Sequence, residues 1–115
     1  MWYNIRMKCA MEAPGPETLE RARQLIAAEE LFAFPTETVY GLGASALSDR
    51  AIRRIYEVKG RPQDNPLIVH TWSPERIPEI GRLTPLAERL AEAFMPGPIT
   101  LVIERRPEIC ARVSA

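Results

Sequence analysis

The apolar residues of this chain alternate between a helical and an extended spacing. Apolar positions three or four residues apart predict helices over residues 18–30, 49–59, 74–78 and 85–94. Short apolar or β-branched runs bounded by proline and glycine predict strands over residues 31–34, 39–44, 66–70 and 99–103. Helices that alternate with strands are typical of an α/β fold, so we predict a twisted, mixed sheet flanked by helices.

The second predicted helix has the clearest ends. Ser48 or Asp49 can cap it, and Gly60 is well placed to end it, which puts Lys59 in its last turn. Each predicted helix also has one apolar face that should point inward. The side chains expected on these faces are Leu19, Ala22, Leu25, Ile26, Ile52, Ile55, Tyr56, Val58, Leu86, Leu90 and Phe94.

Polar residues gather where the first predicted strand ends. The apolar run that closes at Phe34 leads into P-T-E-T-V-Y-G-L-G, a composition typical of a ligand-facing loop. Thr36 and Thr38 alternate with Glu37, so both hydroxyls should point to one side of an extended chain. The hydroxyls can bind an amino-acid ligand or bond their own backbone in a tight turn, and the residues alone leave both open. Tyr40 either walls such a pocket or packs in the core.

Two cations follow the second predicted helix. Lys59 suits the negative end of the helix dipole without any ligand, an effect of about 0.3–1 kcal/mol. That effect does not explain Arg61, nor the Asn65-Pro66 turn that stiffens the loop. Hydroxyls on one loop and cations on another suit a small ligand that carries phosphates. His70, the single histidine, ends an apolar run, where a structural hydrogen bond is the commoner role.

Composition limits the class of partner. The chain has 115 residues, enough for one domain with one core, and Lys plus Arg equals Asp plus Glu at 15 each. This balance excludes a general positive field that would hold nucleic acid. Basic residues exceed acidic ones between positions 49 and 61. A solvated helix face is the plainer explanation there, and a local contact with double-stranded RNA or tRNA stays open.

Neither cysteine belongs to a recognisable site. Cys9 and Cys110 lie near opposite ends of the chain without a C-x-x-C pair, so we expect neither a zinc site nor a disulfide. The sequence has no apolar run of the roughly 18 residues that a membrane span needs. We therefore expect a soluble, cytoplasmic protein. Met1, Met7 and Met11 are all candidates for the true start.

Three blocks of sequence, in this order, resemble the YrdC family. These are the threonylcarbamoyl-AMP synthases, which make the activated intermediate for threonylcarbamoyladenosine in tRNA. The blocks are P-T-E-T-V-Y-G-L-G, K-x-R-x-x-x-N-P-L and P-G-P-I-T-L, and the resemblance runs from about residue 18 to about residue 105. It implies a YrdC-like α/β fold with a concave ligand face. It also implies that a carbamate made from L-threonine and bicarbonate attacks the α-phosphorus of ATP and that pyrophosphate leaves.

The resemblance also assigns roles to the candidate residues. Those implied to bind the substrate threonine are Thr36, Thr38, Tyr40 and His70. Those implied to bind ATP are Lys59, Arg61 and Asn65. Mg²⁺ would accompany the triphosphate, held by phosphate oxygens and water. No nucleophile with a paired base is evident, so no covalent catalytic residue is assigned.

The chain is shorter than the domain it resembles. Family members continue past the P-G-P-I-T-L strand into a Ser-x-Asn segment, so residues 1–115 read as one YrdC-like domain without its C-terminal part. We expect residues 99–103 to form an exposed apolar edge, the chain to form a homo-oligomer, and its own synthase turnover to be small. The alternatives are a non-catalytic nucleotide- or RNA-binding module, a fragment, and the related domain of hydrogenase-maturation carbamoyltransferases.

Overall fold

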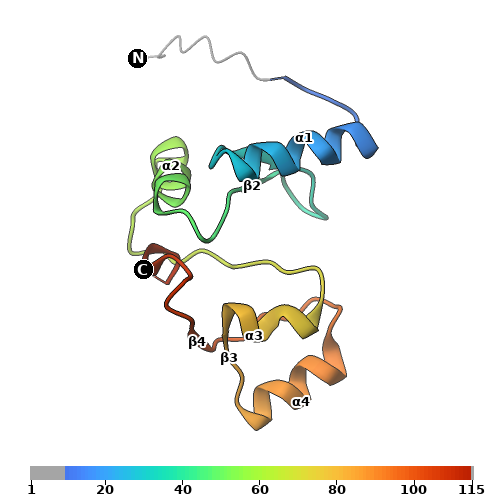
Figure 1. Cartoon of the computed structure of the whole chain (residues 1–115), viewed down its shortest axis with the longest axis vertical. Coiled ribbons are helices and arrows are strands. Elements are labelled where there is room, and N and C mark those ends of the chain that lie inside the picture. Colours follow the sequence, from blue (N-terminus) through green and yellow to red (C-terminus); the bar gives the residue numbers. More distant parts are fainter. Residues whose placement is uncertain (1–9, 115) are drawn as a thin grey trace.

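The computed structural model describes residues 10–114 (Figure 1). Its α-helices are α1 (Pro16–Ala27), α2 (Asp49–Lys59), α3 (Ile77–Ile80) and α4 (Pro85–Phe94), and its 3-10 helices are η1 (Pro74–Arg76) and η2 (Ala111–Val113). The strands are β1 (Phe32–Phe34), β2 (Gly41–Gly43), β3 (Gly81–Arg82) and β4 (Glu104–Arg105). Cys9 and the alternative starts at Met1 and Met7 lie outside the described residues.

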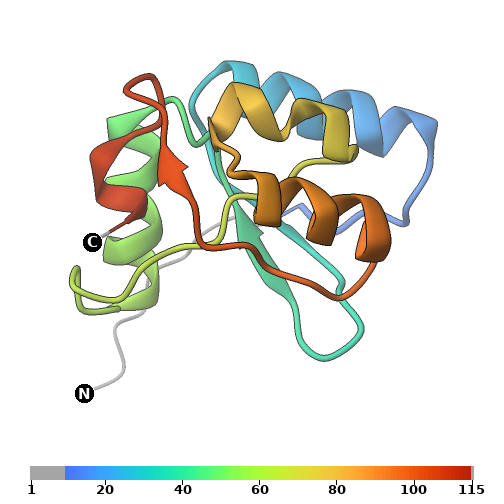
Figure 2. The same cartoon turned by 90° about the horizontal axis from the view of Figure 1, so that it is seen from below.

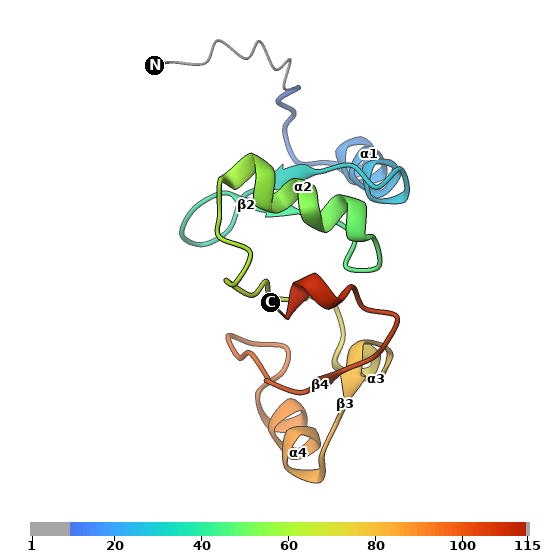
Figure 3. The same cartoon turned by 90° about the vertical axis from the view of Figure 1, so that its left-hand side faces the viewer.

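The described elements form two groups. Figures 1 and 3 show α1, α2 and the β1–β2 pair on one side, and α3, α4 and the β3–β4 pair on the other. The element η2 lies between the two groups, and Figure 2 shows it alongside α2. Because η2 comes more than fifty residues after α2, this packing joins distant parts of the sequence.

The β1–β2 hairpin places two aromatic rings over two glycines. The strands are antiparallel, with Phe32 opposite Gly43 and Phe34 opposite Gly41. A Cβ atom on Gly41 would lie 2.7 Å from the Phe34 ring, so the glycine leaves room for that ring. The strands β3 and β4 form a second antiparallel pair. Within residues 10–114, the predicted single mixed sheet is therefore represented by two separate two-stranded pieces.

Helix α2 carries the core and begins and ends as predicted. The Ser48 hydroxyl caps it by accepting a hydrogen bond from the Ala51 amide at 3.1 Å, a contact worth about 1 kcal/mol. Gly60 ends it in the left-handed conformation, with φ of 58°, which glycine adopts without strain. The main buried cluster consists of Ile52, Ile55, Tyr56, Ile109 and Val113. Val58, predicted to face inward, is exposed instead.

The apolar faces predicted for the first and last helices are wrong in detail. Helix α1 has no buried residue, and Leu19 is 71% exposed. Helix α4 buries Ala87 and Ala91, while Leu86 and Phe94 face solvent. Two alanines one turn apart allow closer backbone contact than two larger side chains do, and the helix packs through that face.

Two predicted strands are absent from the described residues. Residues 66–70 and 99–103 belong to no strand pair of the described chain. For the first segment, the Leu67 amide donates to the Val113 carbonyl at 2.9 Å, which is one backbone bond and not a ladder. In the second segment Val102 is fully exposed, and β4 begins only at Glu104. An apolar run forms a strand only where a neighbouring strand supplies hydrogen-bond partners for its backbone N–H and C=O groups.

No helix in the described part of the chain combines the length and apolar composition needed to cross a bilayer.

Candidate functional site

The loop between β1 and β2 carries the predicted threonine-binding residues. The hydroxyl oxygens of Thr36 and Thr38 lie 3.4 Å apart, which confirms that the two side chains share one side of the loop. Thr36 Oγ1 also accepts hydrogen bonds from the amides of Thr38 and Val39, at 3.3 Å and 3.2 Å, and donates to the Val39 carbonyl. Thr36 therefore closes the turn, whereas Thr38 is exposed and its hydroxyl contacts the hydroxyl of Thr36 and no other described side chain.

Tyr40 ends this loop with its side chain in solvent. It is 77% exposed, so the alternative that it packs in the core is wrong. An exposed phenol offers an apolar face and a hydroxyl to a ligand, but no contact within the described residues directs it toward Thr38. Its role as a pocket wall stays a prediction.

The loop after α2 carries the predicted ATP-binding residues. Lys59 lies in the last turn of α2 and is exposed. Arg61 donates through Nη2 to the Pro66 carbonyl at 3.0 Å, while its Nε is buried without a hydrogen-bond partner in the described part of the chain. The backbone amide of Asn65 donates to the Pro62 carbonyl at 3.2 Å. This turn leaves the Asn65 side chain in solvent.

Lys59 and Arg61 differ from the arginines of α2 in their ion pairing. Arg53 contacts Asp49 at 2.6 Å, Arg50 contacts Glu29 at 3.2 Å, and Arg54 contacts Glu30. In residues 10–114, by contrast, no carboxylate lies within ion-pair distance of Lys59 or Arg61. The α2 arginines therefore form a solvated, neutralised helix face. The two loop cations keep their charge available for an anion.

The single histidine makes a local hydrogen bond. His70 is exposed, and its Nδ1 lies 3.0 Å from the Ile68 carbonyl, so Nδ1 carries the proton and donates it. This is the structural role that a lone histidine most often has. The other ring nitrogen, Nε2, is then an acceptor in the neutral imidazole and can still meet a ligand hydroxyl.

The three parts of the predicted site are the loop of Thr36 and Thr38, His70, and the loop of Lys59 and Arg61, and no direct contact joins them in the described chain. Among the described residues, no hydrogen bond or ion pair links the loop of Thr36 and Thr38 to His70, or either of them to the loop of Lys59 and Arg61. Ligands that bind all three would have to bridge them. The assignment of individual site residues stays a prediction.

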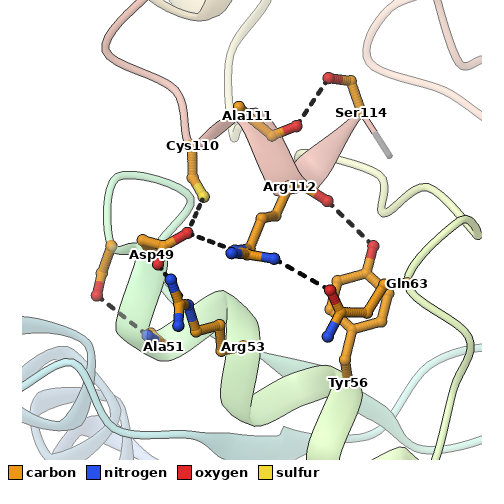
Figure 4. Close-up of polar contacts among 10 residues, drawn as sticks. Asp49, Ala51, Arg53, Tyr56, Gln63, Cys110, Ala111, Arg112 and Ser114 are labelled. Atoms are coloured by element: carbon orange, nitrogen blue, oxygen red, sulfur yellow. Dashed lines mark hydrogen bonds and ion pairs between the residues drawn. The ribbon is translucent and has the colours of Figure 1, made fainter.

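A polar network beside the second loop was missed by sequence reasoning (Figure 4). Arg112 donates through Nε to Asp49 Oδ1 at 2.7 Å and through Nη1 to Gln63 Oε1 at 3.0 Å. The buried Tyr56 hydroxyl lies 2.8 Å from the Asn65 carbonyl and 3.1 Å from the Arg112 carbonyl. No local signal could have found this network, because Arg112 comes from the far end of the described chain.

The carboxylate of Asp49 is held in its charged form by this network. Removal from water by itself would raise the pKa of Asp49. Hydrogen bonds from Arg112, Arg53 and Cys110 outweigh that effect and lower the pKa of Asp49 below its usual value. An open hollow of about 460 Å³ lies beside the network and is lined by Gln63, Arg105, Ala111, Arg112 and Ser114.

Comparison with known proteins identifies the family. The Sua5/YciO/YrdC family model, described as "Telomere recombination", matches residues 24–115. The chain is 54% identical over 85 residues to the threonylcarbamoyl-AMP synthase of Pyrococcus abyssi (strain GE5 / Orsay), an alignment that covers 73% of this chain and 25% of that protein. It is 43% identical over 99 residues to the threonylcarbamoyl-AMP synthase of Bacillus subtilis (strain 168), covering 84% of this chain and 29% of that protein.

A solved structure shows the same fold. The crystal structure of P. abyssi Sua5 complexed with L-threonine matches with a TM-score of 0.79 and 45% identity, over 89% of this chain and 30% of that chain. This likeness confirms the predicted YrdC-like α/β class. The present chain spans between a quarter and a third of the length of these relatives. Since the family model covers most of the chain and the structural likeness covers nearly all of it, the chain belongs to the Sua5/YciO/YrdC family.

Proposed function

We propose that this chain provides threonine- and ATP-binding surfaces for the synthesis of threonylcarbamoyl-AMP from L-threonine, bicarbonate and ATP. That product is the activated intermediate for threonylcarbamoyladenosine in tRNA. The observation that carries the proposal is the 54% identity to the P. abyssi threonylcarbamoyl-AMP synthase. The likeness to a solved relative complexed with L-threonine supports an amino acid as one ligand.

The proposed ATP surface consists of Lys59, Arg61 and Asn65. Lys59 and Arg61 have no carboxylate partner in the described residues, so binding a triphosphate would not first require breaking an ion pair. Arg61 does hydrogen-bond the Pro66 carbonyl through Nη2, and its buried Nε has no partner among residues 10–114. A phosphate oxygen would be a charged acceptor for the terminal N–H groups of this guanidinium.

The proposed threonine surface consists of Thr36, Thr38, Tyr40 and His70. In our account, Thr36 shapes the turn through its own backbone contacts, and Thr38 presents its hydroxyl to the ligand. His70 would accept a hydrogen bond from the ligand hydroxyl at Nε2, since Nδ1 is directed at Ile68. A site that satisfies a ligand hydroxyl rejects an isostere without one, because its own polar groups are then left unpaired.

The proposed reaction needs positioning and charge more than a covalent intermediate. A carbamate oxygen attacks the α-phosphorus, the bond from that phosphorus to the bridging oxygen breaks, and pyrophosphate departs with the electron pair. Negative charge grows on the departing group, and fixed cations such as Lys59 and Arg61 stabilise it. Holding both reactants in line supplies much of the remaining acceleration.

Mg²⁺ enters this proposal as part of the nucleotide substrate. No group of three or more His, Cys, Asp or Glu side chains in residues 10–114 is arranged to hold a metal ion. We propose that phosphate oxygens and water hold most of the coordination sites of this Mg²⁺. We assign the reaction to the cytoplasm, which suits the free thiol of Cys110. The α2 arginines give no support for RNA binding, because each has a carboxylate partner.

Calorimetric titration of the chain tests this proposal. MgATP and L-threonine should each bind, and L-valine, which has the shape of threonine without its hydroxyl, should bind much more weakly. The proposal would be overturned if neither MgATP nor L-threonine bound.

A further inference from the structure

The segment around η2 is hydrogen-bonded to the chain before α2 and to the chain after the loop of residues 61–66, which we call the nucleotide loop. The Cys110 amide donates to the Ala46 carbonyl at 2.9 Å, just before α2, and the Val113 carbonyl accepts from the Leu67 amide at 2.9 Å, just after the loop. Ile109 and Val113 are buried in the same cluster as α2. The backbone around η2 therefore has a fixed position relative to the loop of residues 61–66.

One buried hydroxyl connects this segment to the loop. Tyr56 is 3% exposed, and its hydroxyl lies 2.8 Å from the Asn65 carbonyl and 3.1 Å from the Arg112 carbonyl. A phenol has one proton, so the two carbonyls share it or take it in turn. Either way, the Tyr56 side chain fixes the distance between the loop and η2.

One guanidinium makes a second connection. Arg112 binds Asp49 at the start of α2 and Gln63 in the loop beyond the end of α2 (Figure 4). The other oxygen of Asp49 accepts from Arg53 at 2.6 Å, so the carboxylate that anchors Arg112 is itself held from two directions. The planar guanidinium can reach both partners at once, which an ammonium group cannot do in the same geometry.

The loop has few other attachments. Its internal contacts are the turn from Asn65 to Pro62 at 3.2 Å and the bond from Arg61 to Pro66 at 3.0 Å. In the described part of the chain, the side chains that connect residues 62–65 to the rest of the protein are those of Tyr56 and Arg112. A loop without these contacts would have to be ordered by its ligand, at a cost to affinity.

We infer that Tyr56 and Arg112 are positioning residues for the nucleotide, which hold the loop of Arg61 and Asn65 in its binding geometry without touching ATP. The inference rests on the proposed function and adds two residues to it. The Tyr56 hydroxyl and two nitrogens of Arg112, Nε and Nη1, are already bonded to the protein.

The test compares variants that remove only the connecting atoms. Tyr56→Phe keeps the buried ring, and Arg112→Gln removes the guanidinium. Loss of one such hydrogen bond should weaken MgATP binding by about three- to tenfold in calorimetry, while L-threonine binding changes by less than about twofold. Arg53→Gln is the matched control, because it removes the other arginine from Asp49 without touching the loop, and it should bind MgATP as the wild type does.

A conservative variant separates positioning from stability. Arg112→Lys can keep the ion pair with Asp49 but not the simultaneous bond to Gln63. It should recover the melting temperature lost in Arg112→Gln while MgATP binding stays weak. Amide hydrogen exchange of residues 61–66 should also be faster in Tyr56→Phe and Arg112→Lys than in the wild type, without nucleotide present.

Each outcome has a distinct meaning. Unchanged MgATP affinity in Tyr56→Phe and Arg112→Gln, with a wild type that binds MgATP, would overturn this inference and leave the proposed function standing. A wild type that binds no MgATP would overturn the proposed function and the inference with it. Equal losses of MgATP and L-threonine binding would show a general structural defect and would also overturn the inference.

Discussion

Arg112 Nε lies 2.7 Å from Asp49 Oδ1, although 63 residues separate the two side chains in the sequence. The contact joins η2 to the first turn of α2 and so ties the end of the described chain to its core. It also gives Asp49 a lowered pKa, together with the contact from Arg53. The stability of the chain at acid pH should therefore depend on this carboxylate.

We predict that Asp49 stabilises the folded chain at neutral pH and ceases to do so in acid. Its folded pKa lies below its unfolded value, so the stabilisation is complete above the unfolded pKa and is lost as pH falls through the lower, folded pKa. Melting temperatures measured from pH 7 down to pH 2 should fall less steeply for Asp49→Asn than for the wild type. Asp64→Asn, which removes a loop carboxylate without an ion pair among the described residues, should follow the wild type.

We predict that Gly41→Ala, in the β1–β2 hairpin, lowers the free energy of unfolding. The new methyl would meet the Phe34 ring at 2.7 Å, and the ring would have to move. Overpacking of this kind costs about 1–3 kcal/mol, which urea unfolding can measure. Gly15→Ala is the control, because nothing lies within 4 Å of the added atom. Equal stabilities of the two variants would contradict the packing described for Phe34.

Local signals predicted some parts of this fold and not others. The bounds of α2 followed from Ser48 and Gly60, whose caps depend only on neighbouring residues. The common side of Thr36 and Thr38 was predicted from alternation along an extended segment, but the structure brings the two hydroxyls together through a turn that Thr36 closes. Residues 66–70 and 99–103 were predicted as strands from apolar runs, but a strand also needs a remote partner, which a run of residues does not specify.

The candidate site likewise contains residues with a local sequence signal and residues without one. Lys59 and Arg61 were found because they lie at a helix end within a recognisable motif. Tyr56 was identified as a core residue, but one of its two hydroxyl contacts, to the Arg112 carbonyl, depends on η2, more than fifty residues later. Arg112 gave no signal at all, since its partners Asp49 and Gln63 become neighbours only in the folded chain.

We predict that Thr38 and His70 select threonine over valine. Thr38→Val and His70→Ala should each reduce the ratio of L-threonine to L-valine affinity by about tenfold or more, because each removes a polar partner of the ligand hydroxyl. Thr38→Ser, which keeps the hydroxyl, should retain most of the preference. Competition measured by calorimetry gives the ratios directly. An unchanged preference in both variants would remove these residues from the site.

We also predict self-association through the exposed segment 99–103. Val102 is fully exposed in a segment whose backbone has no strand partner among the described residues, and exposed apolar segments with unpaired backbone groups can pair with copies of themselves. Light scattering should report a dimer or a larger assembly, and Val102→Lys should shift it toward the monomer. Val58→Lys, an equally polar change at an exposed position of α2, should not. A wild-type monomer at micromolar concentration would contradict this prediction.

The most direct measurement for the proposed function is MgATP binding by Lys59→Ala, Arg61→Ala and Arg50→Ala. Loss of one charge-assisted contact to phosphate costs about 1.5–3 kcal/mol, so the first two variants should bind MgATP at least about tenfold more weakly and bind L-threonine normally. Arg50 is already paired with Glu29, so Arg50→Ala should bind MgATP as the wild type does. Equal MgATP affinity in all three variants and the wild type would contradict the account.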